Sequence, residues 1–125
     1  MTNYIDGFIF PISRIHLNTY KEIAEKIAEI WKEHGASAYY EFVGDDLFLE
    51  GTKSFVETLD IKEDQEVVFG WVVFPSKEIR DVANKKVPTD PRMAELVAPL
   101  VNPEKLIFDA SRMVYGGFQP LVQVN

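Results

Sequence analysis

The chain has 125 residues, of which 46% are hydrophobic and 26% charged, a balance typical of a globular protein. It has no cysteine, which excludes disulfides and thiolate metal ligands, and its formal net charge of −7 disfavours binding to nucleic-acid phosphates. No apolar stretch approaches the ~20 residues that span a bilayer, and the first residues lack the basic region of a signal peptide. We therefore expect one domain over residues 1–125, located in the cytoplasm, with neither a nucleic-acid nor a membrane partner.

The N-terminal part of the chain predicts a strand followed by a helix. Tyr4–Phe10 reads as a strand that ends at Pro11. Asn18 is the expected N-cap of a helix that runs to about His34, and Gly35 is its expected stop. The predicted buried stripe recurs at helical spacing and consists of Tyr20, Ile23, Ala24, Ile27, Ala28 and Trp31.

The middle of the chain predicts two further strands around a segment with two interpretations. Ala36–Val43 is the second predicted strand, and Glu66–Phe74 is the third. Between them, the alternation over Phe55–Ile61 favours an extended segment, which the polar turn 62–65 would join to the third strand as a hairpin. A short helix over Lys53–Leu59 is the alternative.

The C-terminal part predicts two helices and a last strand. Ser76 is the expected cap of a helix that Pro88 ends, with a buried stripe of Ile79, Val82, Ala83 and Val87. Asp90 as N-cap and Pro91 at the first helical position begin a second, shorter helix. Met113–Val124 is the expected last strand.

Two features of the last predicted strand indicate that it is irregular. The pair Gly116-Gly117 indicates a bulge or a close backbone contact, and Pro120 fits an edge strand or a strand break. The resulting order is β-α-β-(β)-β-α-β. It predicts an α+β fold of the ferredoxin-like type, βαββαβ with an antiparallel sheet.

Both faces of this predicted sheet are apolar. The third strand presents Phe69, Trp71 and Val73 to one face and Val68, Val72 and Phe74 to the other. The two helices would cover only one face, and an apolar patch of this size is rarely left in water. We expect a second copy of the chain to cover the open face in a homodimer. The alternative is that segments 44–64 and 99–112 fold over it.

Three blocks of the sequence carry a family resemblance: YIDGFIF, EVVFGWVVFPSKEIRDVANKKVPTDPRM and RMVYGGFQPLV. Together they resemble the YbaA-like proteins, a bacterial family of unknown function. The resemblance implies a dimeric α/β-barrel with a ferredoxin-like fold. It implies no particular reaction, because the family has no settled chemistry, and we expect no cofactor.

Two kinds of charged residue are candidates for chemistry. Asp6 lies in an otherwise apolar strand, and a buried carboxylate needs a partner, for which Arg80, Arg92 and Arg112 are available. Asp6 would thus be an ion-pair residue that fixes a helix to the sheet, or a general base in a pocket. Arg80 and Arg92 would bind an anion near one cleft, or tie helix ends together.

Aromatic residues offer a second kind of candidate. An apolar cavity between sheet and helices would be lined by Tyr39, Tyr40, Trp71, Tyr115 and Phe118; a packed core is the alternative. The two histidines, His16 and His34, do not have metal-ligand spacing, so no metal site is expected.

Three functions remain open at this stage. The first is a homodimer that binds a small, partly apolar molecule in a sheet–helix cleft, without a cofactor. The second is a cofactor-independent monooxygenase or isomerase, and the third is a stress-related or interaction protein without a pocket. The ligand-binding candidates are Asp6, Tyr39, Trp71, Arg80, Arg92 and Tyr115; no catalytic residue is assigned.

Overall fold

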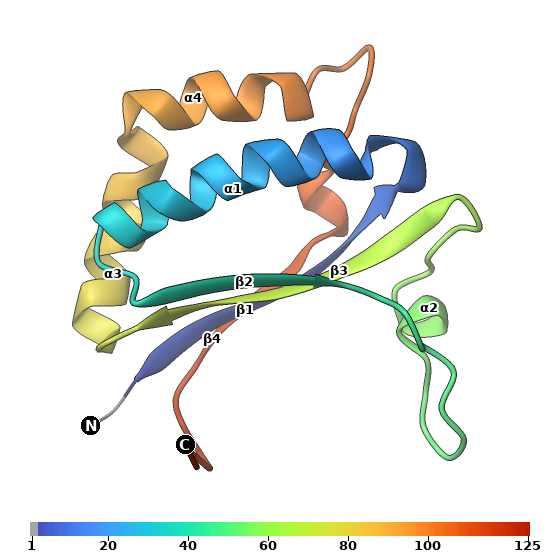
Figure 1. Cartoon of the computed structure of the whole chain (residues 1–125), viewed down its shortest axis with the longest axis horizontal. Helices are drawn as coiled ribbons and strands as arrows, with labels where there is room; N and C mark the ends of the chain where they lie inside the picture. The colour runs from blue at the N-terminus through green and yellow to red at the C-terminus, as the bar shows by residue number, and fades with distance from the viewer. Residues whose placement is uncertain (1–2) are drawn as a thin grey trace.

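The computed structural model describes residues 3–125. Over this range, four strands and four α-helices follow one another along the chain (Figure 1). In order they are β1 Tyr4–Ser13, α1 Leu17–Glu33, β2 Ala38–Val43, α2 Phe55–Thr58, β3 Gln65–Phe74, α3 Lys77–Lys86, α4 Pro91–Val97 and β4 Val114–Phe118.

The four strands form one antiparallel sheet in the order β2-β3-β1-β4. With α1 between β1 and β2, and α3 and α4 between β3 and β4, this is the ferredoxin-like βαββαβ arrangement that the sequence predicts. Helices α1, α3 and α4 all lie on the same side of the sheet (Figure 1). The fold is therefore α+β, with one covered and one open sheet face.

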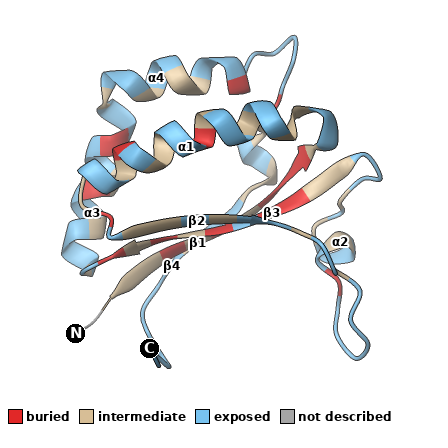
Figure 2. Cartoon of the chain, in the orientation of Figure 1, coloured by how far each residue is buried: buried red, intermediate tan, exposed pale blue. Residues whose placement is uncertain are grey.

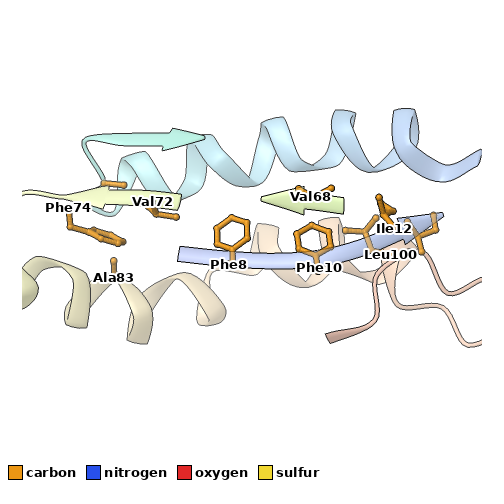
Figure 3. Packing of buried hydrophobic residues seen from close by; sticks show 10 residues of the cluster. Phe8, Phe10, Ile12, Val68, Val72, Phe74, Ala83 and Leu100 are labelled. Carbon is orange, nitrogen blue, oxygen red and sulfur yellow. The ribbon is translucent and has the colours of Figure 1, made fainter. Parts of the chain in front are cut away.

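The hydrophobic core lies between the sheet and these helices. Alternate residues of β1 and β3 point into it because side chains alternate across a strand. Ala83 of α3 and Leu100 close it from the helix side (Figure 3). The buried stretches follow the two central strands, as Figure 2 shows. The core-facing strand residues are Phe8, Phe10, Ile12, Val68, Val72 and Phe74.

The opposite face of the sheet is apolar as well. In an antiparallel pair, directly opposed residues share a face, and Tyr40 opposes Trp71 while Phe42 opposes Phe69. All four side chains lie on the open face and contact one another as rings 5.3–6.5 Å apart. The expected two-sided apolar sheet is confirmed.

The expected alternative cover of this face is present only at one end. The ring of Phe55, from α2, packs edge-on against Phe69 at 6.1 Å. Segment 99–112 instead lies on the helix side, where Leu100 and Ile107 are buried in the core. Much of the open face therefore stays exposed, including parts of Tyr40, Phe42, Phe69, Val114 and Phe118.

Two boundaries in the N-terminal part differ from the sequence prediction. Strand β1 continues through Pro11 to Ser13. Its pairing with β4 extends only as far as Ile9, so at Pro11 the strand has β3 as its one neighbour. Proline, which has no N–H, is tolerated at such an edge position. Helix α1 begins at Leu17 with His16 as N-cap, so the prediction of Asn18 was wrong: a preceding 3₁₀ turn already sets the helical path. The predicted stop at Gly35 is confirmed by its φ of 119°.

The segment with two interpretations is a short helix. Ser54 precedes α2, and its hydroxyl accepts a hydrogen bond from the Val56 N–H at 3.0 Å. The predicted extended segment over Phe55–Ile61 is therefore wrong, and β3 has no hairpin partner before it. The hydrogen bond from Val56 to Ser54 satisfies a backbone N–H at the start of the helix. The alternation of apolar and polar residues carries no information about such a cap.

The caps of the later helices are confirmed. The Ser76 hydroxyl accepts from the Ile79 N–H at 3.2 Å, and the Asp90 carboxylate accepts from the Arg92 N–H at 3.0 Å. The predicted stripe of α3 is only half right. Ala83 and Val87 are fully buried, whereas Ile79 and Val82 are exposed.

The last strand is shorter than predicted. It ends at Phe118, before Pro120, and residues 119–125 pair with no strand of the described range 3–125. The expected close backbone contact holds at Gly117, where an added Cβ would lie 2.4 Å from the Tyr4 hydroxyl and 2.7 Å from Nη2 of Arg80. Glycine thus admits the Arg80 side chain beside the strand.

Candidate functional site

A groove of about 440 Å³ runs between α1 and the edge strand β2. Both elements present small or apolar side chains to it, while Lys21 and Glu25 line it as charged groups. Its apolar and small lining residues include Leu17, Ala24, Ala28, Val43 and Val68. The volume falls within the range of small-molecule sites in proteins.

A carboxyl group bridging two tyrosines forms the polar part of this groove. Glu41 opposes Gly70 in the sheet register, which places it on the helix-facing side of β2. The hydroxyls of Tyr20, from α1, and Tyr39, from β2, each donate to a different oxygen of Glu41 at 2.5 Å. All three residues line the groove.

Burial sets the protonation behaviour of this carboxyl. Desolvation raises the pKa of Glu41 above its ordinary value, although the two tyrosine hydrogen bonds act in the opposite direction. Burial, followed by the nearby charge of Glu41, also raises the pKa of Tyr20 and of Tyr39. Among the described residues no cation contacts Glu41, so the two tyrosine hydroxyls are the groups that compensate its buried charge.

A second buried carboxylate, Asp6, lies on the same sheet face beneath α3. It is fully buried, and its Oδ1 accepts from Nε of Arg80 at 2.9 Å. Its Oδ2 accepts from the Tyr115 hydroxyl at 2.7 Å and from the Asn84 amide at 3.3 Å. The expected ion pair between Asp6 and an arginine is thus present.

The surroundings of Asp6 are largely saturated. Arg80 also donates to Asp81 at 3.0 Å, and its guanidinium lies 5.1 Å above the centre of the Tyr4 ring. Burial, assisted by the hydrogen bond to Asp6, raises the pKa of Tyr115. Oδ1 of Asn84 is buried without a partner among the described residues. The ring of Phe8 separates this cluster from the groove, with ring centres 6.0 Å from Tyr115 and 6.3 Å from Tyr39.

Arg92 lies in a different cluster from Arg80, so the expectation that both would bind one anion in a single cleft was wrong. The guanidinium of Arg92 bonds both oxygens of Glu33 at 3.0 Å and reaches Asp90 at 2.8 and 3.0 Å. His34 contacts Asp90 at 3.1 Å, and the hydrogen bonds from Arg92 and His34 lower the pKa of Asp90. Arg92 therefore ties the end of α1 to the start of α4, which is the structural alternative.

The expected aromatic cavity is divided by the sheet. Tyr39 lines the groove and Tyr115 joins the Asp6 cluster, both on the helix side. Trp71, Tyr40 and Phe118 lie on the open face. Trp71 and Tyr40 oppose each other on that face, and Phe118 opposes Ile5, which also points away from the helices. Placing these three side chains in a sheet–helix cavity was wrong.

Sequence reasoning missed Glu41 and Tyr20 as site residues. The signal for Glu41 was available: in the strand sequence AYYEFV, alternation puts Tyr39 and Glu41 on one face, so a carboxylate enters the side that carries an aromatic core residue. Tyr20 was assigned only to the apolar stripe of the helix, and its hydroxyl was not considered.

Two further findings concern the part of the chain that the structure describes. Over residues 3–125, no three histidine or acidic side chains come together in a way that would hold a metal ion. Within the same range, none of the helices combines the length and the apolar character needed to cross a membrane.

Solved structures with similar folds have low sequence identity. A dimeric ferredoxin-like protein from an uncultured marine organism matches with a TM-score of 0.56 at 8% identity, covering 100% of this chain and 99% of that one. A mutant of SnoaB from Streptomyces nogalater, described as a cofactor-independent oxygenase, matches with a TM-score of 0.52 at 11% identity, over 98% and 94% of the chains. These similarities support the ferredoxin-like fold alone.

Sequence comparisons identify the family of the chain. The model of the family described as protein of unknown function (DUF1428) matches residues 3–110. The uncharacterized protein YbaA of Escherichia coli K12 is 38% identical over 119 residues, which cover 95% of this chain and 97% of YbaA. The chain therefore belongs to the DUF1428 family and is a YbaA-like protein.

Proposed function

We propose that the protein is a homodimer that binds a small, partly apolar molecule in the groove between α1 and β2. The observation that carries this proposal is the groove itself: a volume of about 440 Å³ with apolar walls around one buried carboxyl and two tyrosine hydroxyls. Sites for small molecules combine apolar walls with a few converging polar groups.

The polar groups of the groove indicate what the ligand must supply. With both tyrosine protons directed at Glu41, the tyrosine oxygens keep free lone pairs. A ligand hydroxyl or N–H would donate to them, and its apolar part would lie against Ala28 and Val68. We expect a molecule with one hydrogen-bond donor on an otherwise apolar skeleton.

The dimer is supported by the open sheet face. Its aromatic side chains contact one another but have no cover over most of the face. Monomers rarely expose a contiguous apolar patch of this kind. A protein of similar fold is described as a dimeric ferredoxin-like protein. A two-fold pair that stacks the two open faces would remove both patches from water.

The experiment that tests ligand binding is a melting-temperature screen with small phenols and aromatic alcohols. Ala28→Phe fills the groove, whereas Ala94→Phe adds the same side chain at an exposed position of α4 as the control. A ligand of the groove raises the melting temperature of the wild type and of Ala94→Phe, because it binds only the folded state. It should leave Ala28→Phe unchanged. Equal stabilisation of all three proteins would place the binding elsewhere and contradict the proposal.

A second candidate is a cofactor-independent enzyme of the same fold. Glu41 favours it, since a carboxyl whose pKa burial raises is suited to proton transfer beside a bound molecule. SnoaB, of similar fold, is described as such an oxygenase. Asp6 is less suited to this role because Phe8 separates it from the groove. If the protein turns over a ligand found in the screen, Glu41→Gln should abolish turnover yet retain binding; full turnover by Glu41→Gln would exclude this candidate.

A further inference from the structure

The residues after β4 form an apolar extension, which we call the C-terminal arm and define as residues 119–125. In Figure 1 the arm leaves the sheet on the side opposite the helices. Leu121 is 95% exposed, Val122 81% and Val124 89%. Three aliphatic side chains in such a short segment thus have almost no contact with their own chain.

The exposed apolar area of the open face can be compared with the area that a stable dimer interface buries. The exposed parts of its five large apolar side chains amount to on the order of 500 Å² per copy, since an aromatic side chain has about 150–250 Å² in all. A stable interface buries about 800 Å² per partner. The three arm side chains add roughly 100 Å² each when covered. With the arm included, the apolar side chains alone therefore reach the area of a stable interface.

The strand pairing determines where the arm begins. Phe118 opposes Ile5, Ile5 opposes Val73, and Val73 opposes Ala38. These four residues form one row across the sheet, so the end of β4 and the start of β2 lie at the same end and on opposite edges. A two-fold axis parallel to the strands exchanges the two edges. It brings the end of β4 over the start of β2 in the second copy.

We propose that the C-terminal arm crosses to the second copy and packs on the edge of its strand β2, beginning at Ser37 and Ala38. Strand β2 is an edge strand, so its backbone is free to receive the arm. Because Tyr39 of this strand lines the groove, the arm of one copy borders the ligand site of the other. The inference rests on the homodimer of the proposed function and adds which segment is exchanged and where it lies.

Crosslinking between single-cysteine variants tests the contact, since the chain has no cysteine of its own. Leu121→Cys is mixed with Ser37→Cys and oxidised with diamide, and the covalent dimer is measured on a non-reducing gel. Ile15→Cys replaces Ser37→Cys in the control, because Ile15 is also an exposed aliphatic residue, at 85%. We expect at least tenfold more covalent dimer with Ser37→Cys than with Ile15→Cys. Equal yields would overturn the inference, and so would preferential crosslinking of Leu121→Cys to Ser111→Cys just before β4, which an axis across the strands would produce.

Sedimentation equilibrium separates the failure of this inference from the failure of the dimer. The double variant Leu121→Asp/Val124→Asp should raise the dimer dissociation constant at least tenfold, and Ile15→Asp should leave it unchanged. A double variant that dimerises as tightly as the wild type would overturn the arm exchange and leave the proposed dimer standing. A wild-type protein that is monomeric at micromolar concentration would overturn both.

Discussion

At the scale of single residues, the two buried carboxylates differ in their partners. Asp6 contacts the Arg80 guanidinium, whereas Glu41 contacts two neutral hydroxyls. A cation compensates a buried negative charge and a phenol does so only in part. Asp6 therefore joins α3 to the sheet through an ion pair, and Glu41 is the buried carboxyl that lacks a cation among the described residues. Sequence reasoning found Asp6 because it interrupts an apolar strand, and it missed Glu41 because a charged side chain on an edge strand ordinarily faces solvent.

Glu41 gives a prediction about pH. Its pKa is raised in the folded protein, so the folded state binds more protons than the unfolded state between the ordinary and the raised value. Stability should therefore fall as pH rises from about 4.5, the ordinary value, through the raised pKa. The variant Glu41→Gln lacks this titration. Its free energy of unfolding, relative to that of the wild type, should therefore increase with pH, by about 1.4 kcal/mol if folding raises the pKa of Glu41 by one. Urea unfolding at several pH values measures this, and parallel curves for the two proteins would contradict it.

Asp6 gives a prediction about stability. Asp6→Asn leaves the largely buried Arg80 without its main counter-charge, and we expect a loss of about 3 kcal/mol in the free energy of unfolding. Asp81→Asn is the matched control, because it removes the exposed partner of the same guanidinium and should cost less than about 1 kcal/mol. Similar values for both variants would show that the Asp6 contact does not fix the helix.

At the scale of elements, the sequence predicted what local chemistry determines. The caps at Ser76 and Asp90 and the stop at Gly35 follow from side-chain hydrogen bonding and backbone freedom, which act within a few residues. The errors arose where distant contacts decide. Pro11 stays in a strand because β4 begins only opposite Ile9, and Trp71 faces away from the helices because the register, not its hydrophobicity, sets its side.

Gly70 tests how tightly the central strands pack. An added Cβ would lie 2.6 Å from the Phe8 ring and 2.6 Å from the Tyr40 carbonyl oxygen, and the backbone atom cannot move aside without breaking the β2–β3 pairing. Gly70→Ala should therefore lower the free energy of unfolding by about 3 kcal/mol. Gly116→Ala, where the nearest atom is at 3.7 Å, should cost less than about 1 kcal/mol. Equal effects in denaturant unfolding would argue against the close packing over Gly70.

At the scale of the whole molecule, the sheet separates two surfaces. Its helix side carries the groove and the two carboxyl clusters, and its open side carries the aromatic surface that we assign to the dimer. The sequence predicted both apolar faces but could not tell which aromatic residues belong to which. That assignment depends on register, and a shift of one residue would exchange the faces.

The open face gives a prediction about assembly. Phe118→Glu places a charge on the proposed interface and should yield a monomer at micromolar concentration by sedimentation velocity, because an unpaired charge is costly to bury. Ile15→Glu is the matched control, since Ile15 is also exposed but lies in the 3₁₀ turn before α1. It should remain dimeric. A dimer with Phe118→Glu as tight as the wild type would move the interface away from this face.

Native mass spectrometry of freshly isolated protein tests the central proposal most directly, because one spectrum reports both assembly and bound ligand. We predict a species of twice the 14.3 kDa chain mass that carries a small organic molecule. The molecule should be absent from Ala28→Phe and present in Ala94→Phe. A bare monomer in the wild-type spectrum, or a molecule retained by Ala28→Phe, would contradict a dimer with its ligand site between α1 and β2.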